Sequence, residues 1–218
     1  MIKNELTASD WRRIIAGIAD AIEQHKDKLN ELDGRAGDGD HGVTMSIGYR
    51  AVRESIAGMA PDASVDQVLN KTGRTFLSAA GGAIGPLLGT IWMDGAKTFA
   101  EMADCGPAEC RAFIVGMEVS VERRGKAKVG DKSMLDALHA AAEAVRDEPA
   151  NDIREVWRRA ADAATAAAAA TAALMARIGR ASRVGERSIG FADAGATSIA
   201  LTLESIAGSV DRLCQEAR

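Results

Sequence analysis

The sequence predicts an all-α protein in which eight amphipathic helices run up and down along one bundle. Apolar residues recur at helical spacing along most of the chain. Runs of alternating β-branched residues, which would indicate strands, are missing. With 218 residues, 47% of them hydrophobic, the chain is long enough for one domain with a sizeable core, or at most two small ones. We expect one domain over residues 1–218.

Each expected helix in the first half of the chain has its own start signal. Ser9 and Asp10 are capping candidates for the first helix, and Trp11 begins its apolar face. The second is expected after the glycine-rich stretch "GDGDHG", and the third after "PDAS". Pro86 suits the first turn of the fourth helix, where its missing N–H is not needed. These helices are expected over about residues 9–32, 43–59, 65–79 and 86–103.

The helices of the second half are marked in the same way. Pro107 begins the fifth, and Asp131 is a capping candidate for the sixth. The seventh contains an alanine-rich tract, and alanine favours helix and allows close helix packing. The stretch "DAGATS" leads into the eighth. These helices are expected over about residues 107–124, 132–147, 151–179 and 196–217.

The connectors between these helices are of two kinds. Those after the second, fourth and sixth helices are short and carry a proline with a capping acid or Asn: "MAPDAS", "ADCGPAE" and "RDEPAND". Those after the first, third, fifth and seventh are dense in Gly, Asp, Arg, Lys and Ser: "DGRAGDGDHG", "GGAIG", "RGKAKVGD" and "GRASRVGERSIGFADAG". Short loops join antiparallel neighbours, so we expect the four unusual connectors at one rim of the bundle.

The first unusual connector brings Asp33, Asp38 and Asp40 close together among glycines. Like charges repel, so this arrangement is unfavourable unless a positive charge lies among the carboxylates. Mg²⁺ takes carboxylate oxygens together with waters and substrate phosphates, whereas the strict calcium-loop pattern is missing. The three aspartates are therefore candidate Mg²⁺ ligands; the alternative is that they only form the loop and cap a helix.

Other unusual stretches suit an anionic ligand. His41 and Gly42 stand at a helix start, where backbone N–H groups bind anions. The turn "GGAIG" opens a helix in a similar way, although the Walker A pattern is missing. Arg180 lies in a long irregular segment and could clamp phosphate. The plain alternatives are a helix cap, a tight helix–helix turn, and arginines paired with Glu186 or Asp193.

Composition excludes several classes of partner. A net charge of -4 argues against nucleic acid and anionic membranes. The N-terminus has no apolar signal core, and the alanine tract is too weakly hydrophobic to span a membrane, so we expect a cytoplasmic protein. The cluster Lys126, Lys128 and Lys132 is interpreted as solvated surface charge. Three cysteines without metal-type spacing are interpreted as reduced thiols: Cys105, Cys110 and Cys214.

Taken in order, "LDGRAGDGDHG", "FLSAAGGAIGPLLGT", "RGKAKVGDKSMLDAL" and "GRASRVGERSIG…AGATS" resemble the nucleotide-binding L subunit, or L domain, of dihydroxyacetone kinases. The resemblance covers nearly the full chain. It implies a barrel of eight antiparallel helices with ADP or ATP at one rim. It also implies two Mg²⁺ ions held by Asp33, Asp38 and Asp40, and no catalytic residue of the chain's own. The implied nucleotide contacts are His41, Gly42, Val43, Thr44, Ala83, Ile84, Gly125, Met134, Arg180, Asp193, Ala194 and Gly195.

The resemblance further implies phosphoryl transfer to a sugar held on a separate K-type subunit, so this chain would be active only with that partner. Either ADP stays bound and is rephosphorylated by a phosphohistidine protein of the phosphotransferase system, or ATP binds and ADP leaves. Another ketose such as erythrulose, a homodimer, and a non-catalytic regulatory subunit remain open. The chain departs from the family at Ile84, where Ser is typical, and at Phe191 and Ala194, where His and Pro are usual.

Overall fold

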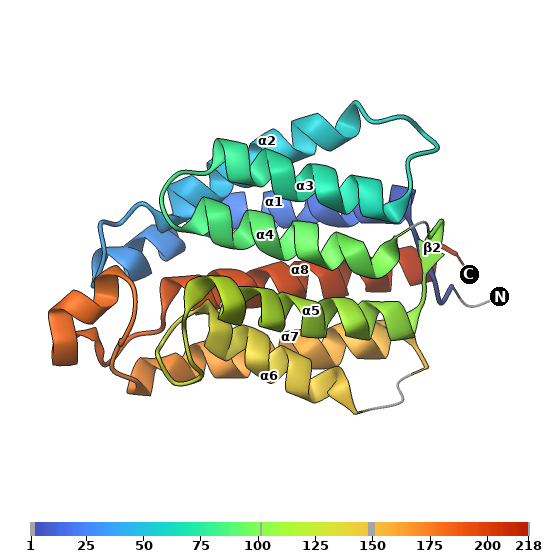
Figure 1. The fold of residues 1–218 in the computed structure, drawn as a ribbon. Coiled ribbons are helices and arrows are strands. Elements are labelled where there is room, and N and C mark those ends of the chain that lie inside the picture. The colour runs from blue at the N-terminus through green and yellow to red at the C-terminus, as the bar shows by residue number, and fades with distance from the viewer. Residues whose placement is uncertain (1–2, 101, 148–150, 218) are drawn as a thin grey trace.

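The computed structural model describes residues 3–100, 102–147 and 151–217. In this part of the chain eight α-helices run up and down the bundle, which confirms the predicted all-α class (Figure 1). In chain order they are α1 (Ala8–Gly34), α2 (His41–Ala57), α3 (Val65–Ala79), α4 (Ile84–Ala96), α5 (Pro107–Gly125), α6 (Met134–Arg146), α7 (Ile153–Ala170) and α8 (Ala194–Glu216).

Two helices end earlier than predicted. The fourth stops at Ala96 instead of 103 and continues as the short 3-10 helix η1 (Lys97–Phe99). Residue 101, within the predicted span, lies outside the described residues. The seventh stops at Ala170 instead of 179 and is followed by the 3-10 helices η2 (Thr171–Ala173) and η3 (Arg180–Ser188). The alanine tract favours helix but does not determine where the helix ends, because tertiary contacts at Thr171 do so.

The expectation of no sheet is wrong in one small respect. Strand β1 (Leu6–Thr7) pairs antiparallel with β2 (Asp104–Cys105), with Leu6 opposite Cys105. Two residues per strand are too few to show an alternating pattern in sequence. The pair lies at the end of the bundle opposite the four unusual connectors (Figure 1).

Two predicted helix caps are also corrected. Thr7 caps α1, and Asp10 closes the capping box by accepting the Thr7 N–H at 2.8 Å. Ser133 caps α6 by accepting the Leu135 N–H at 3.2 Å. Asp131 instead accepts the N–H of the loop residue Lys128. In both cases a residue two positions from a predicted one has the extended backbone that a cap requires.

The core combines a compact aromatic cluster with small residues. Trp11 is fully buried and packs against Phe113 and Trp157 with ring centroids 5.6 and 5.9 Å apart. Although aromatic residues are few, the largest are therefore gathered at one place. Glycines let neighbouring helices approach: a Cβ on Gly95 would lie 2.1 Å from the Phe113 ring. No helix of the described residues is long and apolar enough to cross a membrane. The predicted free thiols are present as such, and all three are buried.

The up-down order places the connectors after α1, α3, α5 and α7 at one end of the bundle (Figure 1). The connector between α6 and α7 contains residues 148–150, which lie outside the described residues. Because α2, α4, α6 and α8 all begin at the end with the unusual connectors, four helix N-termini point toward the same region.

Candidate functional site

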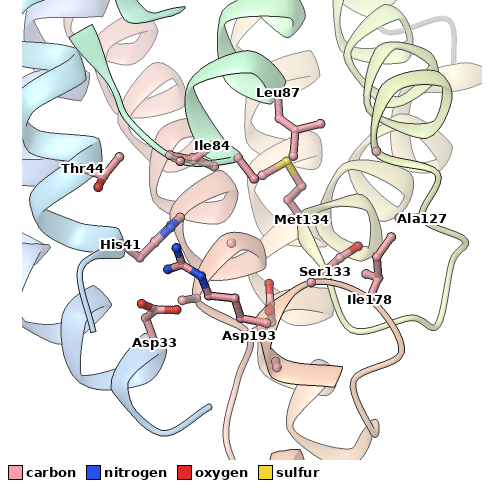
Figure 2. A pocket seen from close by; sticks show the side chains of 18 of the residues that line it. Asp33, His41, Thr44, Ile84, Leu87, Ala127, Ser133, Met134, Ile178 and Asp193 are labelled. Carbon is pink, nitrogen blue, oxygen red and sulfur yellow. The ribbon is translucent and has the colours of Figure 1, made fainter. Parts of the chain in front are cut away.

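A cavity of about 460 Å³ opens at the end of the bundle where the four connectors meet (Figure 2). The first residues of α2, α4, α6 and α8 all line it. Every predicted site residue except Gly42 and Val43 lines it as well: Asp33, Asp38, Asp40, His41, Thr44, Ala83, Ile84, Gly125, Met134, Arg180, Asp193, Ala194 and Gly195.

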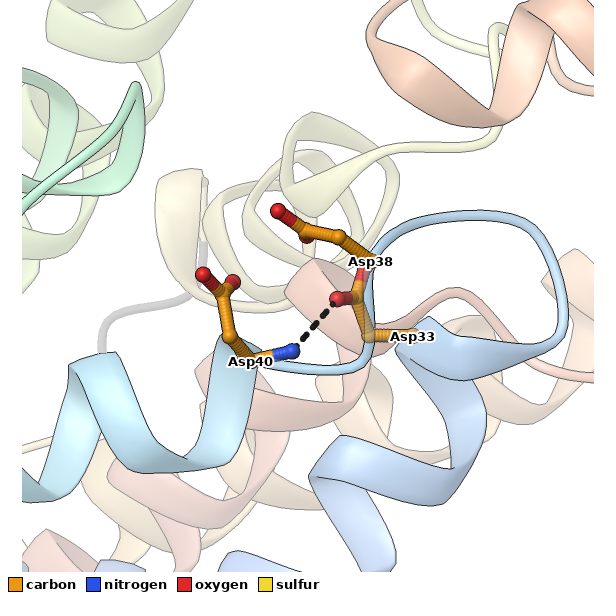
Figure 3. Close-up of side chains that lie close together, drawn as sticks. All are labelled: Asp33, Asp38 and Asp40. Atoms are coloured by element: carbon orange, nitrogen blue, oxygen red, sulfur yellow. Dashed lines mark hydrogen bonds between the residues drawn. The ribbon is translucent and has the colours of Figure 1, made fainter.

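The acidic connector forms one side of this cavity. One carboxylate oxygen from each of Asp33, Asp38 and Asp40 lies within 4.8 Å of the others. The loop is organised by Asp33, whose Oδ2 accepts N–H groups from Gly39 at 2.8 Å and Asp40 at 3.1 Å (Figure 3). A Cβ on Gly37 would lie 2.3 Å from Asp33 Oδ1, so this close approach requires glycine. The glycines therefore allow the three carboxylates to gather.

The three carboxylates repel one another, and the positive charge of Arg180 beside them partly offsets this repulsion. Burial, and then the neighbouring Asp38, raise the pKa of Asp40 above its ordinary value. The Arg180 guanidinium pairs with Asp38 and lies 3.9 Å from Asp40 Oδ1. An all-oxygen set of ligands with side chains partly open to the cavity suits Mg²⁺, which also keeps waters or phosphate oxygens. The residues present therefore fit the predicted metal.

The start of α2 serves the site in two different ways. His41 Nε2 lies 3.0 Å from Ser198 Oγ, and burial lowers the pKa of His41, which keeps its ring neutral at neutral pH. Gly42 faces away from the cavity: a Cβ there would lie 2.0 Å from the Lys26 carbonyl oxygen of α1. The Val43 N–H donates to Asn30 Oδ1 at 3.0 Å, and this amide therefore already has a partner. These two predicted contacts thus face α1.

The opposite wall is apolar. It includes the predicted contact Met134 beside Leu87, Ala127 and Ile178 (Figure 2). Four of its residues were not predicted as site residues: Leu87, Val121, Ala127 and Ile178. Their spacing along the sequence is that of ordinary core positions, so the periodicity carries no signal that separates them from the core. The cavity therefore has a charged side and an apolar side.

The interpretation of Lys132 as solvated surface charge is wrong. Lys126 and Lys128 are exposed, but Lys132 is only 2% exposed and lines the cavity. Its Nζ donates to the carbonyl oxygens of Thr171 at 2.9 Å and Phe191 at 2.6 Å. These acceptors are distant in sequence, which is why the local charge pattern gave no indication of burial.

Asp193 caps α8 at the cavity wall. Its Oδ1 accepts the Ala196 N–H at 2.7 Å, and its own N–H donates to Thr171 Oγ1 at 2.9 Å. Burial raises the pKa of Asp193 to about 6, from an ordinary value of 3.8. The carboxyl group is therefore more readily protonated in the folded chain than in the unfolded chain.

This shift predicts a pH-dependent contribution to stability. Because the pKa of Asp193 is higher in the folded chain than in the unfolded chain, its contribution to stability is fully present below pH 3.8. This contribution is lost as the pH rises through about 6. Asp193→Asn keeps a capping side chain but cannot titrate. We expect the free energy of unfolding of the wild type, minus that of the variant, to fall by about 1–2 kcal/mol between pH 4 and 6. Urea unfolding of both proteins across this range measures it; a flat difference contradicts it.

The fold and the cavity together define a helical-bundle protein with a carboxylate-lined cavity at one end. The chain belongs to the DAK2 domain family, because that domain matches residues 35–208. The resemblance to dihydroxyacetone kinase L subunits is thereby confirmed.

Similar proteins include L subunits and longer kinases. The PEP-dependent dihydroxyacetone kinase 2, ADP-binding subunit DhaL, of Listeria innocua is 35% identical over 181 residues, covering 81% of this chain and 83% of the relative. The corresponding Escherichia coli subunit is 35% identical over 190 residues, covering 86% and 90%. The D-erythrulose kinase of Mycolicibacterium smegmatis is 37% identical over 219 residues, covering 94% of this chain but 37% of that kinase.

A solved structure shares the fold. The dihydroxyacetone kinase of C. freundii in complex with AMP-PNP and Mg²⁺ superposes with a TM-score of 0.69 and 21% identity, covering 96% of this chain and 35% of that one. The chain thus corresponds to about a third of the length of such longer kinases, and its relatives are kinases or kinase subunits.

Proposed function

We propose that this chain is the ADP- or ATP-binding subunit of a kinase for dihydroxyacetone or a related small ketose. It supplies a phosphoryl group from a Mg-nucleotide to a sugar held on a separate K-type subunit. The observation that carries this proposal is the meeting of three carboxylates with four helix N-termini around one cavity. Helix N-termini favour a polyanion and carboxylates favour a cation, so the pair suits a metal-bound phosphate chain.

The two sides of the cavity suit the two ends of a nucleotide. Asp33, Asp38 and Asp40 would hold Mg²⁺, as two ions in the arrangement that the sequence resemblance implies. Thr44 in the first turn of α2 and Ala83 at the cap of α4 would take phosphate oxygens, and the apolar wall around Met134 would take the base. This division supports those predicted nucleotide contacts that line the cavity, and not Gly42 and Val43.

The chain's own residues act by binding and orientation. Arg180 carries a guanidinium beside the carboxylates, where it would pair with phosphate oxygens. His41 is buried and its ring lies within hydrogen-bond distance of Ser198, so it would help to hold the start of α2 in place. When bound, Mg²⁺ supplies neutralisation of the phosphate charge. Phosphoryl transfer depends mainly on such positioning and charge stabilisation, so a subunit without a nucleophile of its own is sufficient.

Calorimetric titration of nucleotide-stripped protein with ADP and ATP tests this function. We expect binding in Mg²⁺ that disappears in EDTA. Tight ADP binding favours a coenzyme that stays bound and is rephosphorylated by a phosphotransferase-system protein, whereas exchangeable ATP favours turnover from ATP. No binding of either nucleotide contradicts the proposal. Adding a K-type subunit and dihydroxyacetone then separates a kinase subunit, which transfers phosphate, from a regulatory subunit, which does not.

The apolar wall gives a prediction about the base. Met134 is buried and lines the cavity close to Gly195, on the side away from the carboxylates. We expect Met134→Ala to weaken ADP and ATP by the same factor, about three- to tenfold, because it removes apolar contact common to both. Calorimetry with each nucleotide measures the two factors. A larger effect on ATP than on ADP would contradict this, because it would place Met134 near the γ-phosphate.

A further inference from the structure

Lys132 stands in an unusual position for a lysine. Its backbone is left-handed, with φ of 61°, and its side chain is 2% exposed. The loop before it is fixed by Asp136, which accepts N–H groups from Gly130 at 2.5 Å and Ser133 at 2.7 Å. A left-handed non-glycine residue and a buried charge both cost free energy. The rest of the fold must offset both costs, because the Lys132 ammonium is held in the interior beside the Thr171 carbonyl.

The ammonium joins two segments that flank residues 172–190, here called the arm. Lys132 Nζ donates to the carbonyl of Thr171 just before the arm and to that of Phe191 just after it. It also lies 4.9 Å from the centre of the Phe191 ring. Arg35, from the acidic connector, places its Cζ 5.6 Å from the same ring. The base of the arm is thus tied to the loop that holds the carboxylates.

The arm is a closed loop that carries Arg180. The two ends of the arm are joined by a backbone hydrogen bond, in which the Gly190 N–H donates to the Ala172 carbonyl at 2.8 Å. Further along, the Ala176 N–H donates to Ser188 Oγ at 2.9 Å. Beyond these bonds the exposed Arg180 reaches across to Asp38. Where the guanidinium stands therefore depends on how firmly the base of the arm is held.

We propose that Lys132 is a positioning residue: by joining the two ends of the arm, it sets the position of Arg180 over the carboxylate cluster. The proposal deepens the function above, since it assigns a residue that controls how the arm meets a bound nucleotide. The first part of the proposal, that Lys132 orders the arm, is a statement about the structure of the free chain, and it does not depend on nucleotide binding.

Hydrogen exchange of the free, full-length chain tests this first part of the proposal. Lys132→Met keeps the length of the side chain and removes the donor and the charge. We expect amides within 172–190 to exchange about tenfold faster, with no change in α1–α5. Unchanged exchange in the arm, or equal acceleration throughout the chain, would overturn the proposal. If Lys132→Met does not fold, Lys132→Gln is measured by the same criteria, and Lys128→Met on the same loop is the exposed control.

A double-mutant cycle tests whether Lys132 acts through Arg180. The probe is a fluorescent ADP analogue with Mg²⁺, and the quantity is its dissociation rate. We expect Lys132→Met to speed dissociation about fivefold, but to have no further effect in an Arg180→Ala background. If the two substitutions instead multiply their separate effects on the dissociation rate, the proposal is overturned, because a lysine with only a structural role would act independently of Arg180. If the analogue does not bind the wild type, the proposed function fails, and the exchange result alone decides the role of Lys132 in ordering the arm.

Discussion

Asp40→Asn is expected to abolish metal-dependent nucleotide binding without weakening the fold. The substitution removes one of the three carboxylates that would hold Mg²⁺, so we expect the affinity for Mg-ADP to fall by at least about a hundredfold. At the same time it removes a charge that burial, and then the neighbouring Asp38, make unfavourable in the folded chain, as the raised pKa of Asp40 indicates. The free energy of unfolding should therefore stay equal or rise.

Opposite signs for binding and stability are what distinguish a ligand site from a structural loop. Asp62→Asn is the matched control, because Asp62 is exposed and belongs to the plain connector between α2 and α3. Calorimetry with Mg-ADP and urea unfolding of both variants give the comparison. Retention of Mg-ADP affinity within about threefold of the control would show that Asp40 only forms the loop.

Gly42→Ala is expected to be among the most destabilising single-methyl changes in the chain. Its Cβ would lie 2.0 Å from the Lys26 carbonyl oxygen and 2.9 Å from Asn30 Oδ1. Because the first of these is backbone, α2 has to move away from α1, and we expect a loss of about 2–4 kcal/mol in the free energy of unfolding. The same movement shifts Asp40 relative to Asp33, so Mg-ADP affinity should fall too.

Gly58→Ala is the control for this change on the same helix. Gly58 follows the last residue of α2 with φ of -88°, and a Cβ there meets no atom within 4 Å. Its effect on stability should be within about 0.5 kcal/mol of zero. Chemical denaturation of both variants measures the contrast, and equal stabilities would mean that α1 and α2 are not in the close contact described.

Most of the fold could be predicted because amphipathic helices repeat their pattern over many residues. Residues 171–190 could not, since "TAALMARIGR" continues the helical propensity of the alanine tract. What ends α7 is tertiary: the Asp193 N–H donates to the Thr171 hydroxyl, and Lys132 binds the Thr171 carbonyl. Propensity is a weak prior, and contacts between distant residues override it.

The charged half of the site was predictable for a different reason. Up-down order alone brings the first, third, fifth and seventh connectors together, so Asp38 and Arg180 could be expected near each other. The direction in which each residue faces could not be predicted from the sequence. Gly42 and Val43 belong to the same motif as His41 but face α1. Lys132 has the local sequence of a surface loop, and only the fold reveals its carbonyl partners.

The Cys214 thiol donates a hydrogen bond to the Lys3 carbonyl at 3.4 Å, so the segments near both ends of the described chain lie beside each other. Strand β1 and the paired Cys105 keep them at the end of the bundle far from the cavity (Figure 1). A purification tag, a surface anchor or a fused fluorescent protein at either end would thus leave the cavity mouth uncovered. Protein immobilised in this way should present the cavity to solution, which suits surface-based measurement of the proposed K-type partner.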